Sequence, residues 1–171
     1  MELKELTEKT MKLFVANDPK VLAEKIFNVV RNNNVDVYER FCNLVQDLGI
    51  DWMQMIYQYY CADRKEKKQD YTPKSLAELM GKLTGEAAVI TDLCAGSGAL
   101  TIQKWNKNHD QKFELYEFDE NVIPFLLFNM AVRNIESTIY HSDVLQQEVD
   151  HTYKIHKGDQ FGKFMEVAKN E

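Results

Sequence analysis

The sequence predicts an α/β fold in which three parallel strands and a C-terminal hairpin follow an N-terminal helical region. Apolar residues recur at helical spacing through the first part of the chain. Beyond the charged stretch 63–69, short apolar runs bounded by turn residues alternate with helical segments. This strand–helix–strand order favours parallel pairing with right-handed crossovers. We therefore divide the chain into a helical region, residues 1–65, and an α/β domain, residues 66–171.

Three helices are expected in the N-terminal region. Asp18 and Pro19 form an N-cap followed by a proline in the first turn, and they start the first helix. The second is expected to end at Gly49, a residue suited to a left-handed cap, and Asp51 is expected to cap the third. Apolar stripes mark the first two helices: Leu22, Ile26, Val29 and Val30, then Val37, Tyr38, Phe41, Cys42, Val45 and Leu48.

The α/β domain begins with a helix that Thr72 and Pro73 open, and we expect its apolar side chains to face inward. Three strands and two helices follow, and the tail 153–167 is typical of two short strands around a turn of Gly and Asp residues. The inward-facing side chains are Leu76, Leu79, Met80 and Leu83, the strands are 87–92, 113–117 and 137–141, and the helices are 98–108 and 121–134.

The composition is that of a soluble globular protein. Of 171 residues, 44% are hydrophobic and 28% are charged, and no apolar run approaches the roughly 18 residues of a membrane span. The N-terminus is charged rather than signal-like, so we expect a cytoplasmic protein with no membrane association. The three cysteines are widely spaced, and none lies beside His151 and His156, so we predict neither a disulfide framework nor a metal site.

The formal charge of −6 argues against tight DNA binding by the chain alone, because such binding draws on neutralised phosphates. The run 64–68 reads Arg-Lys-Glu-Lys-Lys and could form a local basic patch, although such runs are usually solvated helix ends. We therefore expect DNA to be bound weakly or through a partner.

The sharpest local feature is the turn after the first strand of the α/β domain, Asp92-Leu-Cys-Ala-Gly96-Ser-Gly98. The two glycines allow a tight strand-to-helix turn and let a ligand approach backbone N–H groups at a helix N-terminus. The pattern alone is weak: a third dinucleotide-motif glycine is replaced by Thr101, and no phosphate-binding lysine follows. A glycine turn with no ligand is the alternative.

Acids at the ends of the next two strands favour an adenosine-type ligand. Glu117 lies about 20 residues beyond the glycines, where an acid hydrogen-bonds ribose hydroxyls. Asp143 follows the third strand, where its carboxylate could accept from an exocyclic amine. Val144 or Leu145 could then cover the face of an adenine ring.

The order of these segments resembles the adenine-specific (N-6) DNA methylases, most closely the modification subunit of type I restriction systems and its phage-borne relatives. The family's Gln-Phe/Tyr-Tyr-Thr-Pro segment corresponds to residues 69–73, Gln-Asp-Tyr-Thr-Pro, and its Asp-Pro-x-x-Gly-Ser-Gly motif to residues 92–98, with Leu93 in place of proline. Its Asn-Met-x-x-x-x-Ile helix end corresponds to residues 129–135. The resemblance covers about residues 69–145.

The resemblance implies a partial Rossmann-like class I methyltransferase sheet that binds S-adenosylmethionine. Thr72 and Pro73 would border the methionine end of the cofactor. Glu117 would hold the ribose and Asp143 the adenine. We expect Gly98→Val to abolish binding by filling space that the ligand needs. Asp92, Gly96 and Gly98 would shape the amino-acid pocket, and the whole candidate set is Tyr71, Thr72, Pro73, Asp92, Cys94, Ala95, Gly96, Ser97, Gly98, Glu117, Phe118, Asp143 and Val144.

The family's catalytic Asn/Asp-Pro-Pro-Tyr/Phe motif, which would follow a fourth strand, is absent. The only prolines are Pro19, Pro73 and Pro124, so none lies beyond Asp143. A flipped adenine needs that motif to stack its ring and hold its amine. We therefore assign no catalytic residue and expect the isolated chain to transfer no methyl group.

Three functions stay open: a subunit or fragment of a DNA adenine methyltransferase completed elsewhere, a non-catalytic modulator of host modification or restriction that acts by protein interaction, for instance phage-encoded, and a small interaction module with a vestigial pocket. Three parallel strands without a second half leave a sheet edge beside the first or third strand, and the tail hairpin is expected to cover one side. Self-association or a protein partner is therefore expected.

Overall fold

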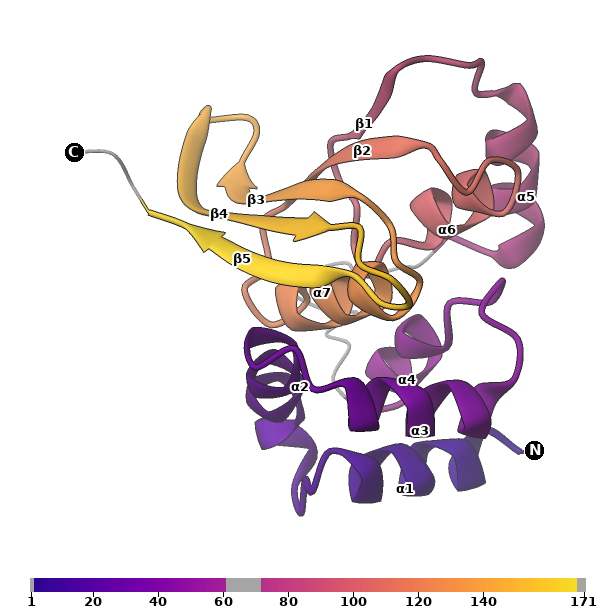
Figure 1. Cartoon of the computed structure of the whole chain (residues 1–171), viewed down its shortest axis with the longest axis vertical. Helices are drawn as coiled ribbons and strands as arrows, with labels where there is room; N and C mark the ends of the chain where they lie inside the picture. The colour runs from indigo at the N-terminus through magenta and orange to yellow at the C-terminus, as the bar shows by residue number, and fades with distance from the viewer. Residues whose placement is uncertain (1, 61–71, 169–171) are drawn as a thin grey trace.

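The computed structural model describes residues 2–60 and 72–168 (Figure 1). Helices α1 to α4 precede a mixed five-stranded sheet, and three further helices are interleaved with its first three strands. The elements are α1 Leu3–Leu13, a 3-10 turn Pro19–Val21, α2 Leu22–Arg31, α3 Val35–Val45, α4 Trp52–Tyr60, α5 Lys74–Leu83, β1 Val89–Asp92, α6 Ala99–Trp105, β2 Lys112–Glu117, α7 Ile123–Val132, β3 Ser137–Asp143, β4 Glu148–His156 and β5 Lys163–Val167.

The predicted helix caps are confirmed at two positions and wrong at one. The Asp18 side chain accepts from the backbone N–H of Lys20 at the 3-10 turn, and Asp51 accepts from the N–H of Gln54 at the start of α4. Helix α3 ends at Val45 rather than at a Gly49 cap, because Gln46 takes the positive φ of 62°. Gly49 instead donates its N–H to Asp47, closing a side-chain turn ahead of α4.

The sheet has the predicted three parallel strands followed by a hairpin. Its order is β1-β2-β3-β4-β5, with β1, β2 and β3 parallel and β4 and β5 antiparallel to their neighbours. The hairpin therefore covers the outer edge of β3. Strand β1 remains at the edge of the sheet in the described part of the chain.

Helix α7 is the centre of the core. All ten of its residues are buried, because the sheet covers one side and the N-terminal helices cover the other (Figure 1). The Phe128 ring meets the rings of Phe14, Tyr38 and Phe41 edge-on, at centroid distances of 5.1, 5.5 and 5.0 Å. The helical region and the sheet therefore share one continuous apolar cluster.

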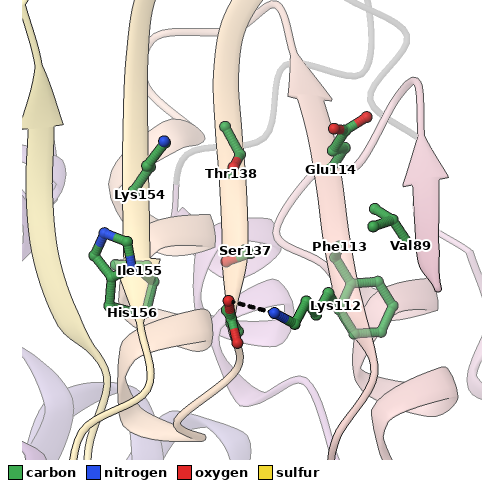
Figure 2. A pocket seen from close by; sticks show the side chains of 10 residues that line it. Val89, Lys112, Phe113, Glu114, Ser137, Thr138, Lys154, Ile155 and His156 are labelled. Atoms are coloured by element: carbon green, nitrogen blue, oxygen red, sulfur yellow. Dashed lines mark ion pairs between the residues drawn. The ribbon is translucent and has the colours of Figure 1, made fainter.

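Only one face of the sheet packs against the core. Right-handed crossovers that step in the same direction place α6 and α7 on the same face. Along β2, Phe113 and Leu115 are buried, whereas Lys112 is exposed and Glu114 half-exposed. On the outer face, Figure 2 shows a hollow at the amino ends of β1 to β3 and the carboxyl end of β4, where Lys112 and Glu136 form an ion pair of 2.9 Å.

The predicted inward direction of the apolar side chains of α5 is wrong. The helix packs on α6 through its small residues: Ala77 is buried, and a Cβ on Gly81 would lie 3.2 Å from the carbonyl carbon of Gln103. This close backbone approach turns the larger side chains outward. Those side chains are Leu76, Leu79, Met80 and Leu83, which are 47%, 49%, 42% and 69% exposed.

The described residues contain neither a membrane-spanning helix nor a cluster of metal-binding side chains. None of their helices combines the length and the apolar character that crossing a membrane requires. Nor do three or more of their His, Cys, Asp or Glu side chains gather in a way that could hold a metal ion.

Candidate functional site

The glycine turn lies at the carboxyl end of β1, as the sequence predicts. Gly96 and Gly98 adopt φ values of 56° and 97°, which side-chain-bearing residues rarely take. The N–H of Ala95 donates to the carbonyl of Tyr116 at 2.9 Å, so the turn is tied to β2. Gly98 then caps the start of α6. The result is the predicted strand–turn–helix junction, in which the N–H of Gly98 donates to the carbonyl of Ala95 within the turn.

Glu117 at the end of β2 is joined directly to this turn. One carboxylate oxygen accepts the N–H of Gly96 at 2.8 Å and the other accepts the N–H of Asp119 at 2.8 Å. Burial raises the pKa of the Glu117 carboxyl, and these backbone donors oppose the rise. Because a carboxylate has about four acceptor positions, Glu117 keeps at least one beyond its backbone donors, enough to accept a hydroxyl.

Asp92 and Cys94 lie at the start of the turn and are joined by a hydrogen bond. The Asp92 carboxylate accepts the N–H of Cys94 at 3.2 Å, and burial raises the pKa of Asp92. The Cys94 thiol is exposed, yet its pKa is raised by partial burial and by the carboxylates of Glu117 and Asp92. A raised pKa keeps the thiol protonated, which does not favour a nucleophilic role.

Gly98 matters for a different reason from the one that the sequence suggested. A Cβ placed on it would lie 2.8 Å from Met130 and 3.1 Å from Leu126, both on α7. A side chain at this position would therefore enter the core and not the ligand's space. Gly98→Val would strain the fold, and the expected effect on ligand space alone is wrong.

The segment after β3 has its own hydrogen bonds. The Asp143 carboxylate accepts from the N–H groups of Leu145 and Gln146 and from the Gln146 side chain, at 2.9 to 3.1 Å. The Leu145 side chain is exposed and that of Val144 half-exposed. His141 contacts the carbonyl oxygen of Phe118 at 3.0 Å, which links β3 to the loop that follows Glu117.

The segment ahead of α5 is only partly described. Tyr71 lies outside the described residues. Thr72 is half-exposed and its carbonyl accepts from the Gln54 side chain of α4 at 3.4 Å. Pro73 is exposed and takes the N-cap position of α5.

Ser97 faces inward and belongs to a buried polar network that sequence reasoning missed. Its hydroxyl donates to Asp51 at 2.7 Å, and Asn129 donates to Asp51 at 2.8 Å and to the Ser97 carbonyl at 2.7 Å. Arg133 donates to the Asn129 side chain at 2.8 Å. A signal was present, because Asn129 and Arg133 are spaced i, i+4 in an otherwise apolar helix.

Charge and burial work against each other in this network. Burial raises the pKa of Asp51, while Arg133 and the donors from Ser97, Gln54 and Asn129 lower it. Burial likewise lowers the pKa of Arg133 to about 10. Arg133 is further bound by the carbonyls of Leu48 and Ile50, at 2.7 and 2.8 Å.

Three parallel strands, with a glycine turn after the first and an acid at the end of the second, make this an α/β domain of the Rossmann-like class. The sequence matches the N-6 DNA Methylase family over residues 46–164, and the chain belongs to that family. The match begins within the helical region, ahead of α4. No curated protein and no solved structure was found to match the chain.

Proposed function

We propose that this member of the N-6 DNA methylase family binds S-adenosylmethionine at the carboxyl ends of β1 and β2. The observation that carries the proposal is the hydrogen bond between Gly96 and Glu117. It joins a glycine turn to a strand-end acid on the neighbouring strand, the two groups that hold an adenosine ligand in folds of this class.

The residues present suit the cofactor. The backbone around Gly96 would receive its amino-acid end, with Asp92 close by for the ammonium group, and the free acceptor position of Glu117 would take a ribose hydroxyl. Asp143 and Val144 would contact the adenine, because Oδ2 of Asp143 accepts from the Gln146 side chain and keeps a second acceptor position for the exocyclic amine. When bound, the cofactor supplies an electrophilic methyl group.

We further propose that the chain does not methylate DNA by itself and acts as a subunit, a fragment or a non-catalytic relative. The family's Pro-Pro motif is missing from the sequence. The strand after β3 also pairs antiparallel with β3 and not with β1. Residues 144–168 therefore provide no parallel strand beside β1 from which such a motif could reach the methyl group.

Calorimetry with S-adenosylhomocysteine tests the binding proposal. We expect a Kd in the micromolar range or weaker, because the described residues enclose the proposed ligand on one side only. Glu117→Gln should weaken binding at least tenfold, since its amide group would meet the N–H of Gly96 or Asp119 donor to donor. Glu114→Gln, on the polar face of the same strand, is the matched control. Absence of binding by the folded wild-type chain at millimolar ligand would contradict the proposal.

A second candidate function, interaction with a second copy of the chain, is favoured by one observation. β1 lies at the sheet edge of the described residues, and α5, which leads into it, exposes Leu79 and Leu83. An edge strand offers unpaired backbone groups, and a two-fold arrangement would pair β1 with its own copy. Such an assembly suits a modulator that acts through protein contacts.

A further inference from the structure

We propose that Asp51 is a positioning residue of the cofactor site, which makes the helical region part of that site. This inference rests on the proposed binding of S-adenosylmethionine, and it assigns the glycine turn a support to which a residue outside the α/β domain, Asp51, contributes. The support is the buried network formed by Asp51, Ser97, Asn129 and Arg133, whose residues are 5%, 1%, 0% and 3% exposed.

The network holds both ends of Ser97. Its hydroxyl donates to Asp51 at 2.7 Å, and its carbonyl accepts from Asn129 at 2.7 Å. Ser97 lies between Gly96 and Gly98, whose backbones both take positive φ. Glycine has the most backbone freedom to lose on folding, so the turn between two glycines needs a fixed point. Ser97 provides it.

Asp51 is held just as firmly on its own side. Besides Ser97, it accepts from Asn129 at 2.8 Å and from the backbone N–H of Gln54 at 2.9 Å. Arg133 locks Asn129 through its side-chain oxygen at 2.8 Å and its backbone oxygen at 3.1 Å. Three distant segments, the loop before α4, the glycine turn and α7, therefore meet at one carboxylate.

The turn is thus gripped from two sides. Glu117 holds the N–H of Gly96 on the ligand side, and Asp51 holds Ser97 on the core side. A buried ionic network is not by itself a source of stability, since desolvation offsets much of its attraction. Its consequence here is geometric: it fixes the backbone groups that the ligand must meet, which reduces the ordering needed on binding.

The experiment compares Asp51→Asn, Ser97→Ala and their double variant with Thr10→Val. Thr10 is a buried hydroxyl on α1 that donates to Leu6 and does not touch the turn. S-adenosylhomocysteine affinity is measured by calorimetry well below each melting temperature. We expect each of the two network variants to raise Kd about tenfold, as for one lost charge-assisted hydrogen bond, and the double variant to add little more. Thr10→Val should bind as the wild type does.

A second measurement keeps the inference independent of the proposed function. Amide hydrogen exchange at Gly96 and Gly98 should accelerate in Asp51→Asn and Ser97→Ala but not in Thr10→Val. If the wild type binds no cofactor while this acceleration occurs, the proposed function fails and the support of the turn stands. If both network variants exchange and bind as the wild type does, the inference is overturned. Ser97→Ala, the milder change, serves if Asp51→Asn does not fold.

Discussion

Helices α7 and α5 are both rich in large apolar residues, yet they lie in opposite environments. Every residue of α7 is buried between the sheet and the N-terminal helices. On α5 the leucines and the methionine are exposed, and Ala77 and Gly81 make the contact with α6. The molecule therefore has one closed end around α7 and one open end around α5 and β1.

This difference separates stability from function. The closed end holds the aromatic cluster around Phe128 and the buried charges. The glycine turn lies between the two ends: its Ser97 reaches the closed side, and its Gly96 and Glu117 face the proposed ligand. The expected effects of substitution therefore fall from the closed end to the open end.

The largest effect is expected from Phe128→Ala. It removes a ring that three other aromatic rings contact, so it should lower the free energy of unfolding by about 4 kcal/mol. Leu83→Ala on α5, where the side chain is mostly exposed, should change it by less than about 0.5 kcal/mol. Urea denaturation of both variants checks this, and equal losses would refute the division into closed and open ends.

Arg133→Met should cost about 3 kcal/mol, because it leaves the buried Asp51 carboxylate without its compensating charge. The loss should depend on pH. Burial raises the pKa of Asp51, so the folded variant favours the protonated acid. Its stability should therefore be highest below the pKa of the unfolded chain and fall as pH rises through the raised folded value. Denaturation of the variant and the wild type from about pH 4 to about pH 8 tests this. A difference in free energy of unfolding that stays constant over this range would contradict it.

Cofactor affinity should fall on acidification through Glu117. Burial raises the pKa of this carboxyl, so it should take up a proton at a higher pH than a free glutamate does. Protonation removes an acceptor that the ribose hydroxyls need, and Kd should rise by about tenfold per pH unit below that pKa. The measurement is a series of calorimetric titrations with S-adenosylhomocysteine at decreasing pH. In Glu117→Gln the same dependence should vanish.

Substitutions at the open end should change self-association of the chain while hardly changing its stability. Light scattering of the concentrated wild-type chain should show dimers. Leu79→Lys on α5 and Val89→Lys on β1 should each return the chain to a monomer, because a lysine charge disfavours burial of an apolar surface and pairing of an edge strand. Lys82→Ala, a change of a charged residue on the same helix, is the control. A wild-type chain that stays monomeric at every concentration would exclude self-association through this end.

The smallest expected signal is methyl transfer itself. Tritiated S-adenosylmethionine with duplex DNA of mixed sequence should give no incorporation above a Glu117→Gln background. Incorporation by the chain alone would reveal a complete active site and refute the proposed lack of catalysis. Incorporation only after adding a second polypeptide would favour a split enzyme over a modulator.

Much of this architecture follows from local sequence pattern. Helical periodicity located α2, and the alternation of apolar runs with helices predicted the three parallel strands and the hairpin. The two glycines and Glu117 were recognisable because a tight strand-to-helix turn and a strand-end acid are encoded within a few residues. Membership of the family is likewise recognisable from short sequence motifs that occur in a fixed order.

Contacts between distant residues decided the rest. Periodicity shows that α5 has an apolar stripe, but only packing shows that its small residues meet α6 and that the stripe faces out. Sequence marks Gly98 as special, but only the position of α7 shows that a Cβ there would enter the core. Asp51, 46 positions from Ser97, acquires its partner only when the chain folds, because a hydrogen bond between distant segments leaves no local periodicity to read.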